Sequence, residues 1–169
     1  MNDKINRDDY LENKISQIPA IELLKAISPD RVAPGYLYIS PDDCMLQRGS
    51  GYNVILKDVL RGQLRKINRY SYGGIENEFS LANIERAIED LDVPLNEGLI
   101  TASEKIYDML ILGRSYQETV GDGKMLSFNL KYIDWEHPEN NILHVTEEFA
   151  VESRDKLHNA RPDIVLFIN

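Results

Sequence analysis

Cysteine and long apolar runs are the features that this sequence of 169 residues has least of. The single cysteine, Cys44, permits no disulfide within the chain and suits a reducing compartment. No apolar run reaches the roughly 18 residues that a membrane-spanning helix needs. The polar first residues also lack the apolar segment that is typical of a secretory signal peptide. The sequence therefore predicts a cytoplasmic protein without a membrane segment.

Signatures of zinc and nucleotide binding are missing as well. The histidines, His137, His144 and His158, are too scattered relative to one another and to Cys44 to indicate a zinc site. Residues 121–124 (GDGK) are not a phosphate-binding loop, because they lack the glycine spacing and the Ser or Thr that follows the lysine in such loops. We therefore expect neither a zinc site nor an ATP site in these residues.

An excess of acidic side chains limits what the chain can bind alone. Its formal net charge is -9 at pH 7. DNA-binding domains are usually basic, because contacts to phosphate supply most of their affinity. We therefore expect the isolated chain to bind DNA poorly. If DNA is its substrate, other domains or subunits must help to hold it.

The spacing of apolar residues predicts an α+β fold whose first part is helical. Helices are expected over residues 8–27, 40–49, 54–67, 80–91 and 99–112. The first of them should be interrupted at Pro19, because proline removes a helical hydrogen bond. We predict a helical N-terminal segment over residues 1–98 and a core of one helix and three strands over residues 99–169.

After Gly113 the apolar pattern alternates, as it does in half-buried strands. Strands are expected over residues 125–135, 142–151 and 163–168. The tight turn at residues 121–123 should let Thr119 pair back with the strand that follows it. Together with the helix before Gly113, these strands are expected to form a meander of the order α-β-β-β.

Basic residues recur every four positions on the helix predicted over residues 54–67. They are Lys57, Arg61, Arg65 and Arg69, and we call them the basic row. The row lies beside a stripe of apolar residues at helical spacing, which indicates a buried face. One interpretation is that the row follows the phosphate backbone of DNA. The other is that it is the solvated face that flanks a core stripe.

The last nine residues, 161–169 (RPDIVLFIN), place a single carboxylate at the opening of a short apolar strand. Pro162 restricts the backbone before Asp163, and the strand after it would hold the carboxylate rigidly. A metal-dependent nuclease of the PD-(D/E)xK type needs its first metal-binding aspartate in this setting. The other interpretation is an aspartate that caps a turn at the start of a strand.

Several segments together resemble the N-terminal nuclease region of the R subunit of type I restriction enzymes. In the second half of the chain they are residues 112–115, 132–141, 144–149 and 161–169, and in the first half residues 19–24, 36–41 and 54–68. The resemblance covers nearly the whole chain and is weakest in the acidic stretch 76–97. It implies an incomplete core of the restriction-endonuclease type, preceded by a helical segment.

The resemblance also implies a function. An R subunit joins a Mg²⁺-dependent endonuclease to a motor that uses ATP, and it works on DNA with the M and S subunits of the restriction-modification complex. Asp163 would be the catalytic, metal-binding aspartate. The Glu-x-Lys element that completes such a site is expected beyond Asn169, so we expect this chain to be an inactive fragment. ATP would bind only to motor domains that these residues do not include.

A second metal ligand could come from the helix predicted over residues 99–112. Glu104 is the best candidate, with Asp108 one turn later on the same face, although an acid solvated near a helix N-terminus explains Glu104 equally well. The alternative to a nuclease is a non-catalytic docking module that contacts the methyltransferase or the motor.

Overall fold

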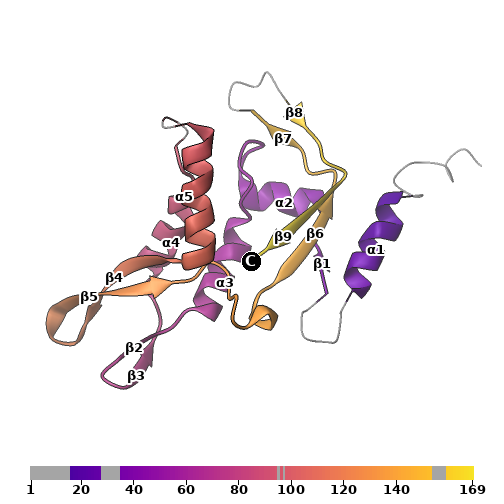
Figure 1. Ribbon diagram of the computed structural model, residues 1–169. Helices are drawn as coiled ribbons and strands as arrows, with labels where there is room; N and C mark the ends of the chain where they lie inside the picture. Colours follow the sequence, from indigo (N-terminus) through magenta and orange to yellow (C-terminus); the bar gives the residue numbers. More distant parts are fainter. Residues whose placement is uncertain (1–15, 28–34, 95, 97, 154–158) are drawn as a thin grey trace, which may run out of the picture. The chain divides into compact units, whose positions relative to one another are not determined.

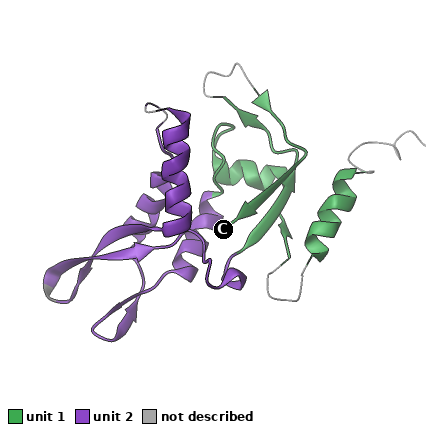
Figure 2. Ribbon diagram, viewed as in Figure 1, with its two compact units in different colours: residues 1–56, 142–168 green, residues 57–141, 169 purple. Residues whose placement is uncertain are grey.

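The computed structural model describes residues 16–27, 35–94, 96, 98–153 and 159–169, which form α-helices and small β-sheets (Figure 1). The predicted α+β class is confirmed. The chain forms two compact units, one of residues 1–56 and 142–168 and the other of residues 57–141 with 169 (Figure 2). The predicted boundary between residues 98 and 99 lies inside the second unit, and it stays a prediction. No helix in the described ranges is long and apolar enough to cross a membrane.

The first unit is built on a three-stranded sheet of order β1-β6-β9. Strand β1 (Leu37–Tyr38) runs parallel to β6 (Leu143–Glu147), and β9 (Ile164–Ile168) runs antiparallel to it. The three middle residues of β6 are buried on both faces of the sheet. A short hairpin of β7 (Val151–Glu152) and β8 (Asn159–Ala160) also belongs to this unit.

Helix α2 (Pro41–Arg48) begins and ends where the sequence predicts. The Ser40 hydroxyl accepts a hydrogen bond from the Asp43 amide at 3.1 Å, and Gly49 ends the helix with a φ of 70°. Arg48, the last residue of the helix, is 3% exposed and donates to the Ala150 carbonyl at 2.9 Å. Its guanidinium also lies 4.0 Å from the centre of the Phe149 ring. These contacts join α2 to the segment after β6.

Helix α1 (Ile18–Ala26) differs from the prediction at Pro19. This proline lies in the first turn and does not interrupt the helix. The first turn tolerates proline because its amide would have no helical partner there. The predicted residues 8–15 lie outside the described part of the chain.

The second unit holds three helices that the sequence predicts: α3 (Lys57–Ile67), α4 (Leu81–Asp90) and α5 (Leu99–Leu112). Helix α3 begins three residues later than expected. Helix α5 ends at Gly113, whose φ of 73° is one that residues with a Cβ rarely adopt. A Cβ there would also collide with the Leu130 carbonyl oxygen. This glycine therefore permits both the helix end and the close approach of the strand.

Two hairpins complete the second unit. Strand β4 (Arg114–Val120) pairs with β5 (Lys124–Leu130) through a turn at Gly121–Gly123, and Thr119 lies opposite Met125 as predicted. A hairpin of β2 (Tyr70–Tyr72) and β3 (Ile75–Asn77) was not predicted, because three-residue strands are too short to show an alternating pattern. A short 3₁₀ turn at Pro138–Asn140 follows β5.

The predicted strands do not form one meander, and two of them are shorter than expected. Strands β4 and β5 pair only with each other, whereas β6 and β9 share a sheet with β1. Strand β5 ends at Leu130 because the next backbone groups bond to a side chain. The amide of Lys131 donates to Asn68 Oδ1 at 2.7 Å, and its carbonyl accepts from Asn68 Nδ2 at 2.9 Å. Strand β6 ends where Glu148 takes a positive φ of 52°.

Buried amide side chains hold the segment after β5 inside the second unit. Asn141 Nδ2 donates to the Asp134 carbonyl at 2.9 Å, and Asn141 Oδ1 accepts from the Asp134 amide at the same distance. Asn169, the residue after β9, donates to the Tyr132 carbonyl at 2.7 Å and to Asn141 Oδ1 at 2.8 Å. These bonds satisfy backbone groups that no strand partner reaches.

Glu118 on β4 secures the start of α4. Its side chain is buried, and one carboxylate oxygen accepts from the Ser80 amide at 2.8 Å, the Ser80 hydroxyl at 3.0 Å and Asn83 Nδ2 at 2.8 Å. A negative charge at a helix N-terminus is also favoured by the helix dipole. This carboxylate therefore satisfies three donors at once.

We predict that Glu118→Ala lowers the free energy of unfolding by about 1 kcal/mol or more, because it removes the acceptor of three part-buried hydrogen bonds at the start of α4. Urea unfolding followed by circular dichroism measures this change. Glu89→Ala removes an exposed acid from the same helix and should change the free energy by less than about 0.5 kcal/mol. Equal effects of the two variants would contradict the role assigned to Glu118.

We expect His144 to make the stability of the first unit depend on pH. It lies in the middle of the sheet, between Leu37 and Phe167, and its Nδ1 has no partner among the described residues. Burial lowers the pKa of its imidazole. The folded chain therefore keeps His144 neutral at a pH at which the unfolded chain already takes up a proton. As a result, stability falls as the pH drops below the ordinary histidine pKa.

We expect His144→Phe to weaken the fall in stability between about pH 7 and pH 5, because the variant has no imidazole to protonate. Thermal unfolding at several pH values measures this. His137→Gln is the matched control, since His137 is exposed. If the His144 variant keeps the pH dependence of the original chain, the buried imidazole is not its source.

Candidate functional site

Asp163 lies directly before β9, with its backbone fixed and its side chain exposed. The Glu148 amide donates to the Asp163 carbonyl at 3.1 Å, which extends the bonding between β6 and β9 past the end of both strands. The Asp163 carboxylate has no hydrogen-bond or ion-pair partner in the described part of the chain. A rigid backbone thus carries a carboxylate that is open to a ligand.

The other acids at this end of the sheet are already engaged. Glu147 accepts a hydrogen bond from the Tyr38 hydroxyl at 3.0 Å. Glu148 accepts from Gln17 Nε2 at 3.1 Å and forms an ion pair with Arg161. Burial, followed by the bond to Glu147, raises the pKa of Tyr38 and keeps its hydroxyl a donor. Asp163 is thus the acid of this group whose charge is left unpaired.

Metal binding by Asp163 stays a prediction. The described residues contain no group of three or more His, Cys, Asp or Glu side chains that could hold a metal ion. Mg²⁺ is commonly bound by one or two carboxylates, with water and substrate phosphate completing the shell. Asp163 could take one such position, since its carboxylate is exposed and has no partner among the described residues.

Glu104 is exposed on α5, in the second unit, whereas Asp163 belongs to the first unit. It lines a shallow pocket with Ser103, Tyr107 and Asp108. The expectation that Glu104 and Asp108 share a helical face is therefore correct. The role of Glu104 as a metal ligand stays a prediction.

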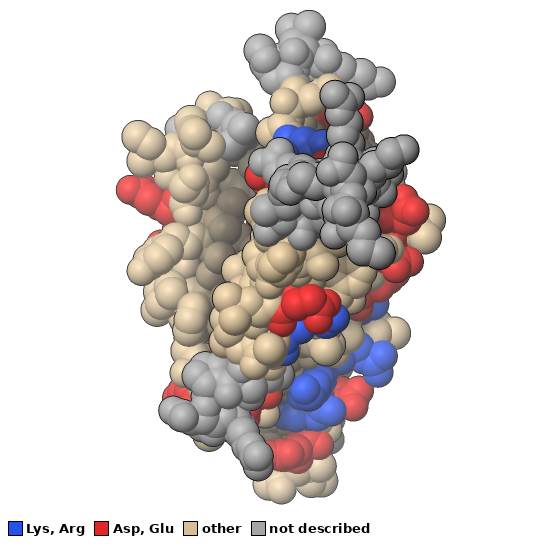
Figure 3. Space-filling model, turned by 90° about the vertical axis from the view of Figure 1, so that its right-hand side faces the viewer, with Lys and Arg blue, Asp and Glu red and all other residues tan. Residues whose placement is uncertain are grey.

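The arginines of the basic row are ion-paired with acids of their own unit. Arg61 lies between Asp58 and Glu85, and these bonds raise the pKa of its guanidinium further. Arg65 and Arg69 reach the two oxygens of Glu78, at 3.4 and 3.1 Å. The face in Figure 3 likewise shows Lys and Arg side chains lying next to Asp and Glu side chains.

Ion pairing lowers the net charge that the basic row presents to a polyanion. Lys57 is exposed at the start of α3, and the structure records no ion pair for it. The partners of the arginines lie directly after β3, on α4 and in the first turn of α3, so helical spacing did not predict most of them. DNA binding by the row stays a prediction.

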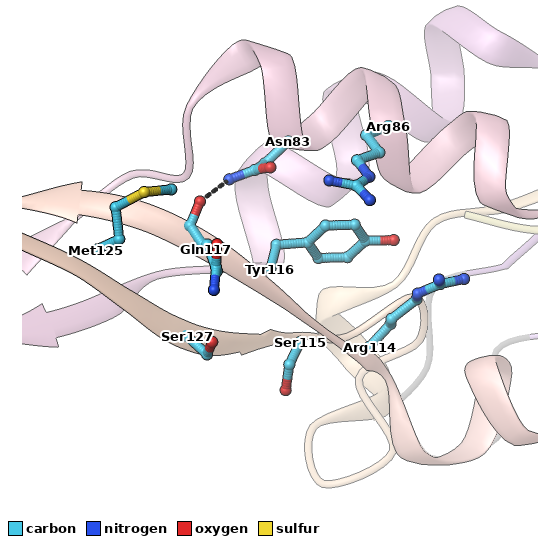
Figure 4. Close-up of a pocket in the computed structure, with 8 residues that line it drawn as sticks. All are labelled: Asn83, Arg86, Arg114, Ser115, Tyr116, Gln117, Met125 and Ser127. Carbon is cyan, nitrogen blue, oxygen red and sulfur yellow. Dashed lines mark hydrogen bonds between the residues drawn. The ribbon is translucent and has the colours of Figure 1, made fainter.

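A polar pocket of about 460 Å³ lies between α4 and the β4–β5 hairpin, and no motif in the sequence predicted it (Figure 4). Its lining residues are Asn83, Arg86, Arg114, Ser115, Tyr116, Gln117, Met125 and Ser127. They come from three elements that are separate in sequence. The packing of α4 against β4 brings them together.

The described residues thus form an α+β chain with an exposed aspartate at the opening of a sheet strand. The family model of the type I restriction enzyme R protein N terminus matches residues 9–169. The match covers nearly the whole chain, so the chain belongs to this family, and the resemblance stated from the sequence is confirmed. No curated protein and no solved structure matches the chain.

Proposed function

We propose that this chain is the N-terminal part of a restriction subunit and that Asp163 supplies a carboxylate for the cleavage of unmodified DNA. The observation that carries this proposal is the state of Asp163. Its carboxylate is exposed and unpaired within the described ranges, and a hydrogen bond from the Glu148 amide to its backbone carbonyl holds its position. The family match supports the class of enzyme.

The surroundings of Asp163 suit a ligand for Mg²⁺. A bound Mg²⁺ polarises phosphoryl oxygens and supplies hydroxide near neutral pH. Asp163 would bind this ion, and the pairing of β6 with β9 would keep the carboxylate in one position. Tyr38 and Arg161 hold the neighbouring glutamates away from that role. Glu104 remains the candidate for a second carboxylate.

The wider assembly is part of the proposal. As in the resembled enzymes, the subunit would act with M and S subunits, which hold the recognition sequence, and with a motor that hydrolyses ATP. The net charge of -9 supports a role for the other subunits in holding DNA, because electrostatic attraction to phosphate adds little to the DNA affinity of so acidic a chain.

We expect Asp163→Asn in the complete R subunit, assembled with its M and S subunits, to lower DNA cleavage by about 100-fold or more. The asparagine keeps the shape of the side chain and removes the charge that a metal ion needs. ATP hydrolysis should be unchanged, because the motor is a separate site. Cleavage of a plasmid and release of phosphate are measured on the same preparation.

Asp42→Asn is the matched control, because Asp42 is an exposed acid of the same unit. It should leave cleavage unchanged. Normal cleavage by the Asp163 variant would refute the catalytic role. Loss of ATP hydrolysis along with cleavage would indicate a structural role for Asp163.

A docking module is the second candidate function, and helix α5 favours it. Four apolar side chains on this helix are more than 60% exposed: Leu99, Ile100, Tyr107 and Leu112. Exposed apolar side chains in such number are typical of surfaces that another protein covers. Under this alternative, Ile100→Asp would impair assembly with the other subunits, and Asp163→Asn would leave cleavage intact.

A further inference from the structure

We propose that the pocket between α4 and the β4–β5 hairpin binds a backbone phosphate of DNA. This inference rests on the proposed function for its ligand and adds a contact that the sequence did not indicate. The pocket belongs entirely to the second unit, so its geometry is that of one compact body.

Charge distinguishes this pocket from the rest of the chain. Its lining holds two arginines and no carboxylate, in a chain whose net charge is -9. Arg86 is exposed and has no partner among the described residues. Arg114 is partly offset by Asp90, 3.4 Å away. Among the described residues, the pocket therefore presents one unpaired positive charge, on Arg86, and a second that Asp90 partly offsets, on Arg114.

The arrangement of the arginines fits one phosphate approached from two sides. Figure 4 shows Arg86 extending from α4 toward β4, and Arg114 lying at the start of that strand. Tyr116 lies between them, and its hydroxyl donates to Asp90 at 2.8 Å. That bond, with the ion pair to Arg114, keeps Asp90 engaged. Guanidinium groups bind phosphate through two parallel N–H bonds, so a planar pair of donors suits this ligand.

Uncharged donors at the rim of the pocket lie on the outer face of the hairpin, opposite the face that carries Arg114 and Tyr116. Gln117 lies directly opposite Ser127, and Ser115 follows on the same face two residues away. The side chains of these three residues have no partner in the described ranges. The side-chain amide of Asn83 is not available to donate to a ligand, because it already donates to the Gln117 carbonyl at 2.7 Å and to Glu118. Hydroxyl and amide groups of this kind are common contacts to phosphate oxygens.

A DNA strand explains the size of the pocket better than a free phosphate ion does. The volume of about 460 Å³ exceeds what a single phosphate occupies, and Met125 adds an apolar side chain to the polar lining. Such a lining suits a phosphate together with its adjoining sugar. Phosphate contacts fix the position of a protein on DNA without reading its sequence, which agrees with recognition by another subunit.

The test measures binding of the full chain to a fluorescent DNA duplex, by anisotropy between about 50 and 200 mM salt. We expect Arg86→Gln to weaken binding about tenfold at the lower salt and to reduce the salt slope by about 1. Ser127→Ala should weaken binding less and leave the slope unchanged, because it removes a donor without a charge. Circular dichroism confirms that each variant is folded.

Lys25→Gln is the matched control for charge, since Lys25 is a paired surface residue of α1 in the other unit. It should bind as the original chain does. Three outcomes would overturn the proposal: no measurable binding by the original chain at the lower salt, binding by Arg86→Gln that equals the original, or an equal loss in Lys25→Gln. Arg65→Gln in the same assay tests the basic row separately.

Inorganic phosphate distinguishes a DNA contact from a site for a small anion. In nuclear magnetic resonance spectra, the amides of Ser115, Gln117 and Ser127 should shift when the duplex is added. If they shift with phosphate alone and not with the duplex, the assignment to DNA is wrong. The Asp163 test does not depend on these results, because cleavage by the assembled complex is measured there. The two proposals can therefore fail independently.

Discussion

The antiparallel ladder between β6 and β9 is the constraint on which the position of Asp163 depends. Five residue pairs join the strands, from Leu143 opposite Ile168 to Glu147 opposite Ile164. One further bond, from the Glu148 amide, reaches the Asp163 carbonyl. A shift of register by one residue would move every side chain of β9 to the other face. The buried middle of β6 resists such a shift, so the core of the first unit also sets the orientation of the candidate ligand.

The sequence predicted structural features that depend on neighbouring residues, and it missed features that depend on residues remote in sequence. The ends of α2 and α5 were predicted correctly because Ser40, Gly49 and Gly113 act on neighbouring backbone groups. The length of β5 was wrong because Asn68, which is remote in sequence, takes the hydrogen bonds of Lys131. Strand β1 was missed because two residues carry no detectable period, and its partner β6 lies more than a hundred residues away.

The same difference between interactions of neighbouring and of remote residues applies to the candidate sites. Asp163 was found from the sequence because the Arg-Pro-Asp tripeptide and the strand after it are contiguous. The pairing of the basic row could not be predicted, since the fold alone brings Glu78, directly after β3, to Arg69 and brings Glu85, on α4, to Arg61. Arg86 was overlooked for the opposite reason. It lies in an acidic stretch of the sequence, and only the fold places it beside Arg114.

An acidic chain can still contact DNA when its unpaired basic groups are concentrated in one place. Charges separated by more than about 10 Å are largely screened at physiological salt. The excess of acids therefore acts mainly on the approach of DNA, and the groups within a few ångströms decide what is held there. In the polar pocket those groups are guanidinium, hydroxyl and amide donors, while Asp90 and Glu118 are bound to neighbouring side chains. The first unit shows the reverse arrangement at Asp163, where one carboxylate is left unpaired while its acidic neighbours are engaged. At both candidate sites, neighbouring charges are engaged with each other, and the groups that have no partner among the described residues, Arg86 and Asp163, are the ones suited to a ligand.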